Sequence, residues 1–545
     1  MRRFTLIAAV MASAASLGPA RSGPLAPSAV HSVPSWAVPH ARVGGVPADE
    51  PVTLHVVLPW RNEAEARRNA KAVSDPRSPR YAKYMTPSEF RARFAPPAST
   101  VSAIGGWLHG AGLQIGFVPD NNLVIPARGP AAAVERAFAV TLGRYRVAGT
   151  TLRAPDAEPV LPAVLTRNGA TVRGFHEGDK LISPGHIDEF PPPPTLPEDP
   201  ATALDSPRPN AVVYAPPCSA FDGEKTNKKL PPYRGARHPA VVCATTPRAL
   251  QAAYGLTPLL KQGIDGTGET IVMVGSHSIR TLEEDVEEWS RRRRLPPMFP
   301  GQLRQFSHPG SFYAQDDPTG SVLRPSVWAV QSAMLIETMR AIAPGASYIY
   351  AGSATSFDLP YMTLLAINGR WGDVIVNGWY TLNEDDTETD TLLISRMGLQ
   401  AANTGISLLF ASGDLGDGTH HGNTAPSVAY PAHNPDVTAV GATSLILGRG
   451  GKYAGELGWA KSVRRLEKGK WNEPIPADFR GSGGGASHIN AMPDYQSGVV
   501  PESLATHPDG FVGRAVPDIA VAGDAETGML IGYTQRFPDG SVRYS

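Results

Sequence analysis

The chain of 545 residues has few cysteines, no net charge and no long apolar run. It contains only two cysteines, Cys218 and Cys243, which excludes a disulfide-rich scaffold. Its 50 basic and 50 acidic residues cancel, so charge gives no reason to expect nucleic acid or an anionic membrane as a partner. No stretch approaches the ~18 uncharged apolar residues of a membrane span. What is present is a globular composition, long enough for several domains.

The first residues have the pattern of a secretory signal. Arg2 and Arg3 precede an apolar run from Phe4 to Ala15, and small residues follow near Ala20. We therefore expect residues 1–20 to be a signal peptide and the mature protein to be secreted, with no membrane attachment after the signal is removed. In an exported protein Cys218 and Cys243 either form one disulfide or remain two thiols, and two cysteines do not decide between them.

Periodicity divides the rest of the chain into segments. Residues 21–50 are rich in Pro, Ala and Ser and are expected to be a leader, while residues 51–183 alternate strand and helix patterns, which indicates an α+β domain. One helix should start after Thr86, with Pro87 at its first position and Glu89 completing a capping box. Residues 184–245 are Pro-rich and are predicted to be an exposed linker, either a plain tether or a site of proteolysis.

Residues 246–545 are predicted to form an α/β domain. Short apolar strands without alternation are separated by helical patterns, which favours a parallel sheet covered by helices on both faces; the strands are expected at 270–275, 346–350, 373–377, 407–411 and 437–441. The ligand-binding and catalytic residues of such sheets lie at the C-terminal ends of the strands. The segments there are Asn377 to Tyr380, Ser412 to Gly416 and Gly481 to Ser487. Each alone is typical of a structural turn.

A helix is predicted from Ser326 to a point before Pro344, because the residue ahead of a proline avoids the α region. Gln331 and Leu335 are four residues apart and therefore share one face of this helix. Two side chains that act together in catalysis would be placed on one helix face in this way.

Together these segments resemble the sedolisin family of serine-carboxyl peptidases, the kumamolisin-like acid endopeptidases with a subtilisin-like fold. The matching stretches are Thr246 to Gly255, Ile342 to Ala346, Ala402 to Gly416, Ala429 to Thr443, Ser482 to Gln496 and Gly513 to Gly528. The first domain is similar to the family's activation prodomain, through Val56 to Asn62, Ser74 to Phe90 and Gly106 to Leu113.

The resemblance implies a mechanism with a serine nucleophile, a glutamate base, an aspartate that orients the base, and a second aspartate that stabilises the oxyanion. Asp414 matches the oxyanion aspartate. Gln331 stands at the base position and Leu335 at the partner aspartate position, and neither ionises. Glu337 is nearby, but on a helix it points about 200° away from Leu335. The resemblance places substrate contacts at residues Gly378, Trp379, Gly483, Gly484 and Gly485.

The nucleophile segment, Gly-Thr-Ser, does not occur in these 545 residues. The resemblance would place it, and the calcium loop of the family, beyond residue 545, so we expect a C-terminally truncated catalytic domain, no cofactor or metal in this chain, and an apolar cleft open to water. A subtilisin-type triad built on Asp265, His420 and His421 is the alternative, but no serine motif accompanies these residues. No zinc-ligand spacing occurs either.

The sequence therefore predicts a secreted, prodomain-bearing sedolisin homologue that is catalytically inactive and binds peptides or a partner peptidase. Two alternatives stay open: an active acid endopeptidase whose remaining segment is encoded beyond residue 545, and a gene fragment. The expected partners are a peptide or unfolded protein, a partner peptidase and the protein's own prodomain.

Overall fold

The computed structural model describes residues 32–147, 149–182, 219–228, 230–232, 234–237, 240, 245–311, 313–314, 325–381, 388–421, 423, 425–462, 466–474, 479–524, 527–536 and 542–544. All of them belong to one compact unit, His31–Ser545. The predicted signal peptide, Cys218 and Cys243 lie outside the described residues. Among the described helices, none is long and apolar enough to cross a membrane.

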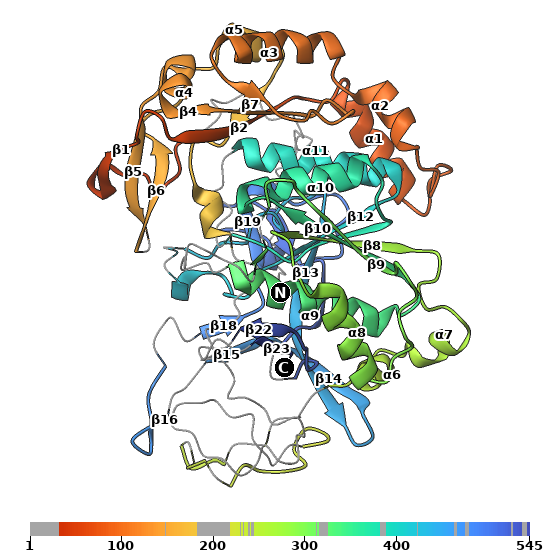
Figure 1. Ribbon diagram of the computed structural model, residues 1–545. Helices are drawn as coiled ribbons and strands as arrows, with labels where there is room; N and C mark the ends of the chain where they lie inside the picture. The colour runs from red at the N-terminus through yellow and green to blue at the C-terminus, as the bar shows by residue number, and fades with distance from the viewer. Residues whose placement is uncertain are drawn as a thin grey trace, which may run out of the picture. The chain divides into compact units, whose positions relative to one another are not determined.

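The N-terminal domain contains two antiparallel sheets and five helices (Figure 1). The four-stranded sheet has the order β3-β4-β2-β7, with β2 Pro51–Val57, β3 Gln114–Ile115, β4 Val124–Pro130 and β7 Thr171–Arg173. The three-stranded sheet has the order β1-β5-β6, with β1 Arg42–Gly45, β5 Leu142–Val147 and β6 Thr150–Pro155. The helices are α1 Glu63–Ser74, α2 Pro87–Phe94, α3 Ala98–Gly110, α4 Ala131–Phe138 and α5 Ala163–Thr166.

The start of α2 confirms the predicted capping box. The Thr86 hydroxyl accepts a hydrogen bond from Glu89 N, and Glu89 Oε2 accepts one from Thr86 N at 2.8 Å. The β3 strand has only the two residues Gln114–Ile115, which pair with β4.

The C-terminal domain contains an eight-stranded sheet of order β14-β13-β12-β11-β8-β10-β9, with β21 paired to β13. Its strands are β8 Thr270–Ser276, β9 Leu303–Ser307, β10 Ser347–Ser353, β11 Val374–Asn377, β12 Ser407–Ala411, β13 Thr438–Gly448, β14 Lys452–Gly458 and β21 Ile519–Ala522. Every strand pair is parallel except β13 with β14. The predicted fold class, a helix-covered parallel sheet preceded by an α+β domain, is confirmed.

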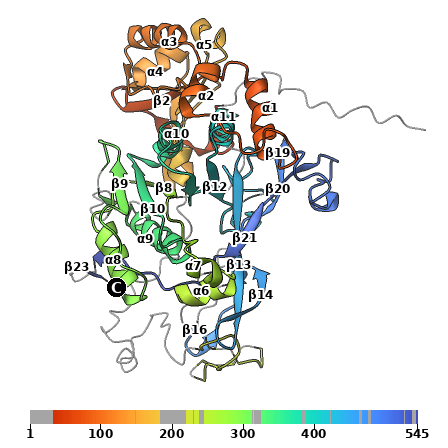
Figure 2. The same ribbon diagram turned by 90° about the vertical axis from the view of Figure 1, so that its right-hand side faces the viewer.

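Helices cover both faces of this sheet. They are α6 Pro247–Ala253, α7 Thr257–Lys261, α8 Leu282–Arg292, α9 Pro325–Ile342, α10 Leu359–Asn368 and α11 Glu388–Thr404. Figures 1 and 2 place α10 and α11 on the face nearer the N-terminal domain, and α8 and α9 on the other face. The α9 helix ends before Pro344, as predicted.

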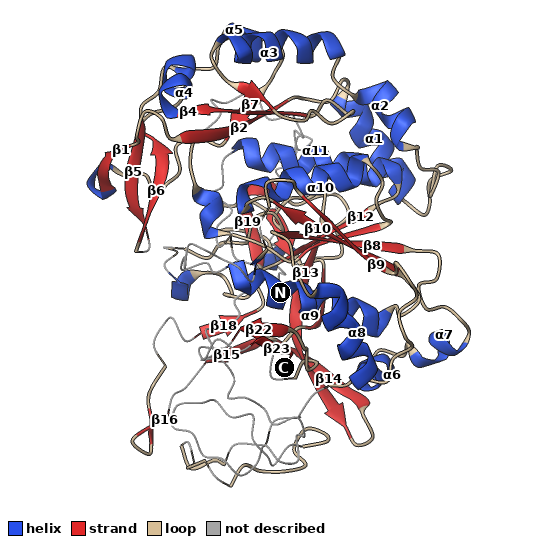
Figure 3. Cartoon of the chain, viewed as in Figure 1, coloured by secondary structure: helices blue, strands red, loops and turns tan. Residues whose placement is uncertain are grey.

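The other strands of the C-terminal domain lie outside the large sheet (Figure 3). They are β15 Ala460–Ser462, β16 Leu466–Glu467, β17 Lys470–Trp471, β18 Phe479–Gly481, β19 Gly485–Ala491, β20 Gly513–Val516, β22 Thr534–Arg536 and β23 Val542–Tyr544. Ile519 and Val521 on β21 are exposed, whereas the middle of β8 is fully buried.

The N-terminal domain packs directly on α11. Its residues Trp60, Phe90 and Phe94 belong to the same buried apolar cluster as Leu399 of α11. Trp60 Nε1 donates to Arg396 O at 2.9 Å, and this bond is buried. The two domains therefore share part of one core.

Candidate functional site

The site is built where α9 meets the loop after β11. Gln331 on α9 is 2% exposed, and its Nε2 donates a hydrogen bond to Gly378 O. A Cβ on Gly378 would lie 2.6 Å from Leu335 Cδ1 and 2.9 Å from Gln331 Nε2. A side chain at residue 378 would therefore require the ends of the Leu335 and Gln331 side chains to shift, and glycine allows this close contact without such a shift. Gln331 and Leu335 thus share the face of α9 that contacts this loop, as their spacing predicts.

The bond from Gln331 has a direction that matters chemically. An amide nitrogen can donate to the Gly378 carbonyl, whereas an ionised carboxylate only accepts hydrogen bonds. The other amide atom, Gln331 Oε1, is buried and has no partner among the described residues. The position is therefore suited to a donor.

Asp414 follows β12 and lies beside the same loop. The Tyr380 hydroxyl donates to Asp414 Oδ1, and Tyr380 is only 2% exposed. Gly413 has φ +100°, and a Cβ there would lie 3.3 Å from the Tyr380 ring. The loop 378–380 therefore contacts Gln331 at one end and Asp414 at the other, and it brings the three predicted catalytic positions together.

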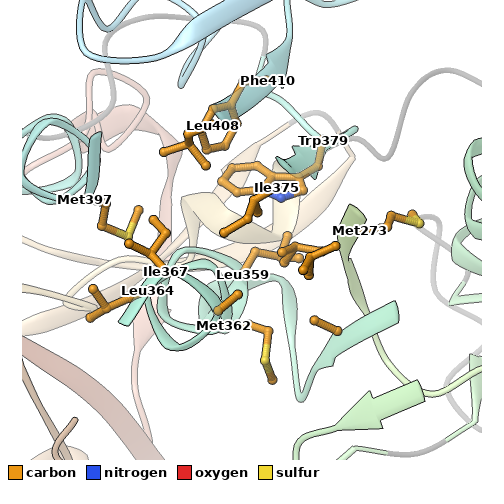
Figure 4. Packing of buried hydrophobic residues seen from close by; sticks show 14 of the residues in the cluster. Met273, Leu359, Met362, Leu364, Ile367, Ile375, Trp379, Met397, Leu408 and Phe410 are labelled. Atoms are coloured by element: carbon orange, nitrogen blue, oxygen red, sulfur yellow. The ribbon is translucent and has the colours of Figure 1, made fainter. Parts of the chain in front are cut away.

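The Trp379 side chain points into the core rather than toward a ligand. It is fully buried, its Nε1 donates to Asn377 Oδ1 at 3.0 Å, and its ring meets Phe410 edge to face at 5.3 Å (Figure 4). Only the Trp379 backbone is left for the substrate contact that the resemblance implies.

The glycine run lets two backbone segments approach closely. Gly483 N donates to Gly413 O at 2.8 Å, and a Cβ on Gly483 would lie 1.7 Å from Ser412 O. Gly485 has φ +142° and pairs with Val516. A Cβ on Gly484 would lie 3.1 Å from Val516 O. This close backbone contact accounts for the glycine at residue 483 without any ligand. The glycine run also lies next to the Asp414 loop.

Glu337 faces a different part of the molecule. It is fully buried, and it accepts a hydrogen bond from Gly532 N at 3.1 Å. Burial raises the pKa of Glu337 to about 9. Because its partner lies in the segment before β22, Glu337 does not replace the base expected at residue 331.

The residues of the alternative triad have local structural roles. Asp265 Oδ1 accepts from Thr267 N at 3.0 Å and from Thr267 Oγ1 at 2.7 Å, which closes a turn. The His420 ring stacks on Phe479 at 4.3 Å, and His421 Nε2 lies 2.7 Å from Phe479 O. Among the described residues no group of three or more His, Cys, Asp or Glu is placed to hold a metal ion.

Sequence reasoning gave no role to Tyr380, although it stands in a segment singled out for its place after a strand. A tyrosine hydroxyl two residues after Gly378, close to a strand end, is the signal that could have pointed to it. Its contact with Asp414 joins the ends of two strands and depends on the parallel pairing of β11 with β12.

Comparison with known proteins agrees with this architecture. Residues 40–177 match the family model described as "Pro-kumamolisin, activation domain". Xanthomonalisin from Xanthomonas sp. (strain T-22) is 25% identical over 527 residues, covering 90% of this chain and 56% of that protein. Sedolisin from Pseudomonas sp. (strain 101) is 24% identical over 514 residues, covering 88% of this chain and 72% of that protein. The chain thus spans about half the length of xanthomonalisin.

Kumamolisin from Bacillus sp. (strain MN-32) is 28% identical over 305 residues, covering 54% of this chain and 48% of that protein. A solved structure, Pseudomonas sedolisin (serine-carboxyl proteinase) complexed with two molecules of pseudo-iodotyrostatin, aligns with a TM-score of 0.41 at 18% identity. That alignment covers 55% of this chain and 75% of the other.

A prodomain joined to a helix-covered parallel sheet, with Asp414 at a strand end, defines the class as a peptidase homologue made with an activation prodomain. The chain is a homologue of sedolisin-family peptidases, and its N-terminal domain matches the activation prodomain over residues 40–177.

Proposed function

We propose that this protein is exported, that it does not hydrolyse peptide bonds by the serine-carboxyl route, and that it binds peptide segments or a partner peptidase. The observation that carries the proposal is the buried hydrogen bond from Gln331 Nε2 to Gly378 O. A general base must accept a proton from its nucleophile. An amide nitrogen that donates to a backbone carbonyl has no lone pair for this task.

A second contact supports the same proposal. The Tyr380 phenol donates to Asp414 Oδ1. An oxyanion-stabilising acid acts by giving a hydrogen bond to the reacting carbonyl oxygen. The carbonyl oxygen of a substrate would compete with Tyr380 for hydrogen bonding to the Asp414 carboxyl. At the other end of the loop, Gln331 supplies no general base.

The alternative of an active acid endopeptidase draws on two observations. Asp414 is retained beside the loop 378–380, and the relatives are longer than this chain. The alternative requires a nucleophile from further sequence and a base other than residue 331. Glu337 is not that base, because it binds Gly532.

The direct test is an assay of the full chain on a denatured protein substrate at about pH 3 to 5, close to ordinary carboxyl pKa values. We expect no turnover, and no difference between the wild-type protein and Asp414→Ala. Robust cleavage that Asp414→Ala abolishes would refute the proposal.

Export is tested separately by expression with residues 1–20 in place. We expect the protein in the exported fraction with residues 1–20 removed, as the charged and apolar pattern of that segment indicates. If the prodomain is also cut away, N-terminal sequencing should find the new end between Pro184 and Cys243. Retention inside the cell with an intact N-terminus would contradict the proposal.

A further inference from the structure

The segment that leads into β22 lies against both α8 and α9. We call residues 529–534 the strap. Leu530 O accepts a hydrogen bond at 2.8 Å from Nε1 of Trp289 on α8. Gly532 N donates one at 3.1 Å to Oε2 of Glu337 on α9. The backbone of the strap is therefore bound by side chains of two helices.

The end of the strap is bound by a second acidic side chain. Thr534 N donates to Asp285 Oδ2 at 2.9 Å, and Thr534 Oγ1 donates to Asp285 Oδ1 at 2.5 Å. The β23 strand contacts the same helix, because the Arg292 guanidinium lies 4.6 Å from the centre of the Tyr544 ring (Figure 2). Two of the three helix side chains that hold the strap are therefore acids.

Both acids lie away from water. Glu337 is fully buried, and Asp285 is 3% exposed. A charge on a buried carboxyl is costly unless a cation compensates it. Three described ionisable groups act on Glu337: Asp285, Arg293 at the C-cap of α8, and Tyr544 of β23. Because Arg293 is the one cation among these three, it cannot compensate two ionised carboxyls.

The strap can open without disruption of the large sheet. The β22 and β23 strands form a two-stranded sheet of their own, and neither pairs with a described strand of the large sheet. Leu530 is 52% exposed, whereas Met529 and Tyr533 are partly buried against apolar clusters. Opening therefore breaks the contacts with the two helices and this limited apolar packing.

We propose that the strap is a pH-sensitive switch, seated on α8 and α9 while Glu337 carries its proton and released locally as the pH rises. Ionisation of Glu337 in the seated state places a negative charge near Asp285 in a buried site. When the strap is released, water reaches both carboxyls and solvates that charge. Release also uncovers the indole N–H of Trp289, because Leu530 O is its acceptor.

The sign of the pH dependence is set by the proton on Glu337. Burial raises the pKa of Glu337 in the seated strap to about 9, from an ordinary value of 4.5. Its contribution to the seated state is therefore complete below about pH 4.5 and is lost as the pH rises toward 9. Burial also raises the pKa of Asp285, which acts in the same direction. The equilibrium constant for opening should rise by up to about tenfold per pH unit.

Hydrogen exchange of the full chain, measured by mass spectrometry, tests the switch. The amides of residues 529–534 report opening of the strap, and those of residues 272–274 in β8 report unfolding of the large sheet. After correction for intrinsic exchange rates, we expect the opening constant of the strap to rise at least about tenfold between about pH 5.5 and pH 7.5. It should exceed that of β8 at both pH values.

Two variants test the groups that hold the strap. Glu337→Gln removes the titration and keeps an oxygen that accepts from Gly532 N, so opening should change at most about threefold over the same pH range. Thr534→Val removes the hydroxyl that binds Asp285 and should raise the opening constant about tenfold at both pH values. Glu283→Gln, at an exposed residue of α8, is the matched control and should keep the wild-type rise.

Circular dichroism checks that each variant folds, and the pH series of the wild-type protein decides the question if a variant does not. Opening constants equal to those of β8 at both pH values would overturn the switch, because the strap would then open only with the whole sheet. Strap opening that does not change with pH would overturn it as well. An equal rise in Glu337→Gln and wild type would overturn the role of Glu337.

Discussion

Gln331 differs from a glutamate by a single group, and the contact that it makes depends on that group. Its Nε2 donates to Gly378 O inside a site that is 2% exposed. A carboxylate there would place negative charge against a carbonyl oxygen, away from water. Only the protonated acid could donate the same bond. Residue 331 is therefore adapted to an amide.

The buried donor contact of Gln331 predicts how Gln331→Glu behaves. Burial and the facing carbonyl raise the pKa of the new carboxyl above its unfolded value, so its stability contribution is complete at low pH and is lost as the pH rises. Urea unfolding should show a loss of about 1–3 kcal/mol at pH 7 and much less at about pH 4. Gln262→Glu is a matched control, because Gln262 Nε2 also donates to a backbone carbonyl, that of Pro258, but on the surface. Equal stability of Gln331→Glu and wild type at pH 7 would contradict the prediction.

The burial of Glu337 predicts a second pH dependence, that of the free energy of unfolding of the whole protein. Its pKa is raised to about 9 by burial, from an ordinary value of 4.5, so the folded protein holds a proton that the unfolded chain releases. The stability from this group is complete below about pH 4.5 and falls as the pH rises toward 9, by up to about 1.4 kcal/mol per pH unit.

Glu337→Gln removes this titration and keeps an oxygen that accepts from Gly532 N. We expect the melting temperature of the variant to change less between about pH 5 and pH 8 than that of wild type. Glu502→Gln, at an exposed residue, should keep the wild-type profile. Parallel profiles of Glu337→Gln and wild type would show that Glu337 is ionised in the folded protein.

At the scale of elements, the ion pair between β7 and α11 joins the prodomain to the peptidase-like domain. Arg173 donates to Asp390, and both side chains are less than 10% exposed. Arg173 Nη1 also donates to Phe357 O at 2.9 Å. A buried guanidinium that loses its hydrogen-bonded carboxylate keeps, among carboxylates, only the weaker electrostatic interaction with Asp179, whereas replacing both partners of the pair by apolar residues removes both of their charges.

We therefore expect Asp390→Leu alone to cost about 3–5 kcal/mol in urea unfolding, and Arg173→Met with Asp390→Leu to recover most of that loss. The control is Arg67→Met, which breaks the exposed pair with Asp436 across the same interface and should cost at most about 1 kcal/mol. A double variant no more stable than Asp390→Leu would contradict this account of the pair.

The sequence predicts well those elements whose signals are local. The capping box at Thr86, the end of α9 before Pro344 and the run of parallel strands follow from neighbouring residues. The Tyr380–Asp414 contact and the burial of Trp379 arise from pairing between strands distant in the chain. No local pattern indicates such contacts, so the sequence points to the segments at the strand ends but not to the contacts between their side chains.

At the scale of the whole molecule, the prodomain is part of the folded core rather than a loosely attached cover. Trp60 and Phe90 meet edge to face at 5.1 Å inside the cluster that extends to α11. Asn121 Nδ2 donates to Gln400 Oε1 at 2.8 Å in the same buried interface. Asn69 Oδ1 and Arg396 Nη1 in this interface have no hydrogen-bond partner among the described residues, so the apolar burial contributes most to its stability.

This interface predicts that cutting the chain does not separate its domains. A specific protease site placed within residues 190–200 should yield two pieces that co-elute in size-exclusion chromatography at neutral pH, because the shared core is retained. Trp60→Ala should let them separate at lower urea concentration, since truncating a buried tryptophan costs about 3–5 kcal/mol. Trp107→Ala, within the prodomain's own core, is the comparison, because Trp107 packs on Phe138 and not on α11. Spontaneous release of the cut wild-type prodomain would show that the contacts with α11 do not hold the domains together.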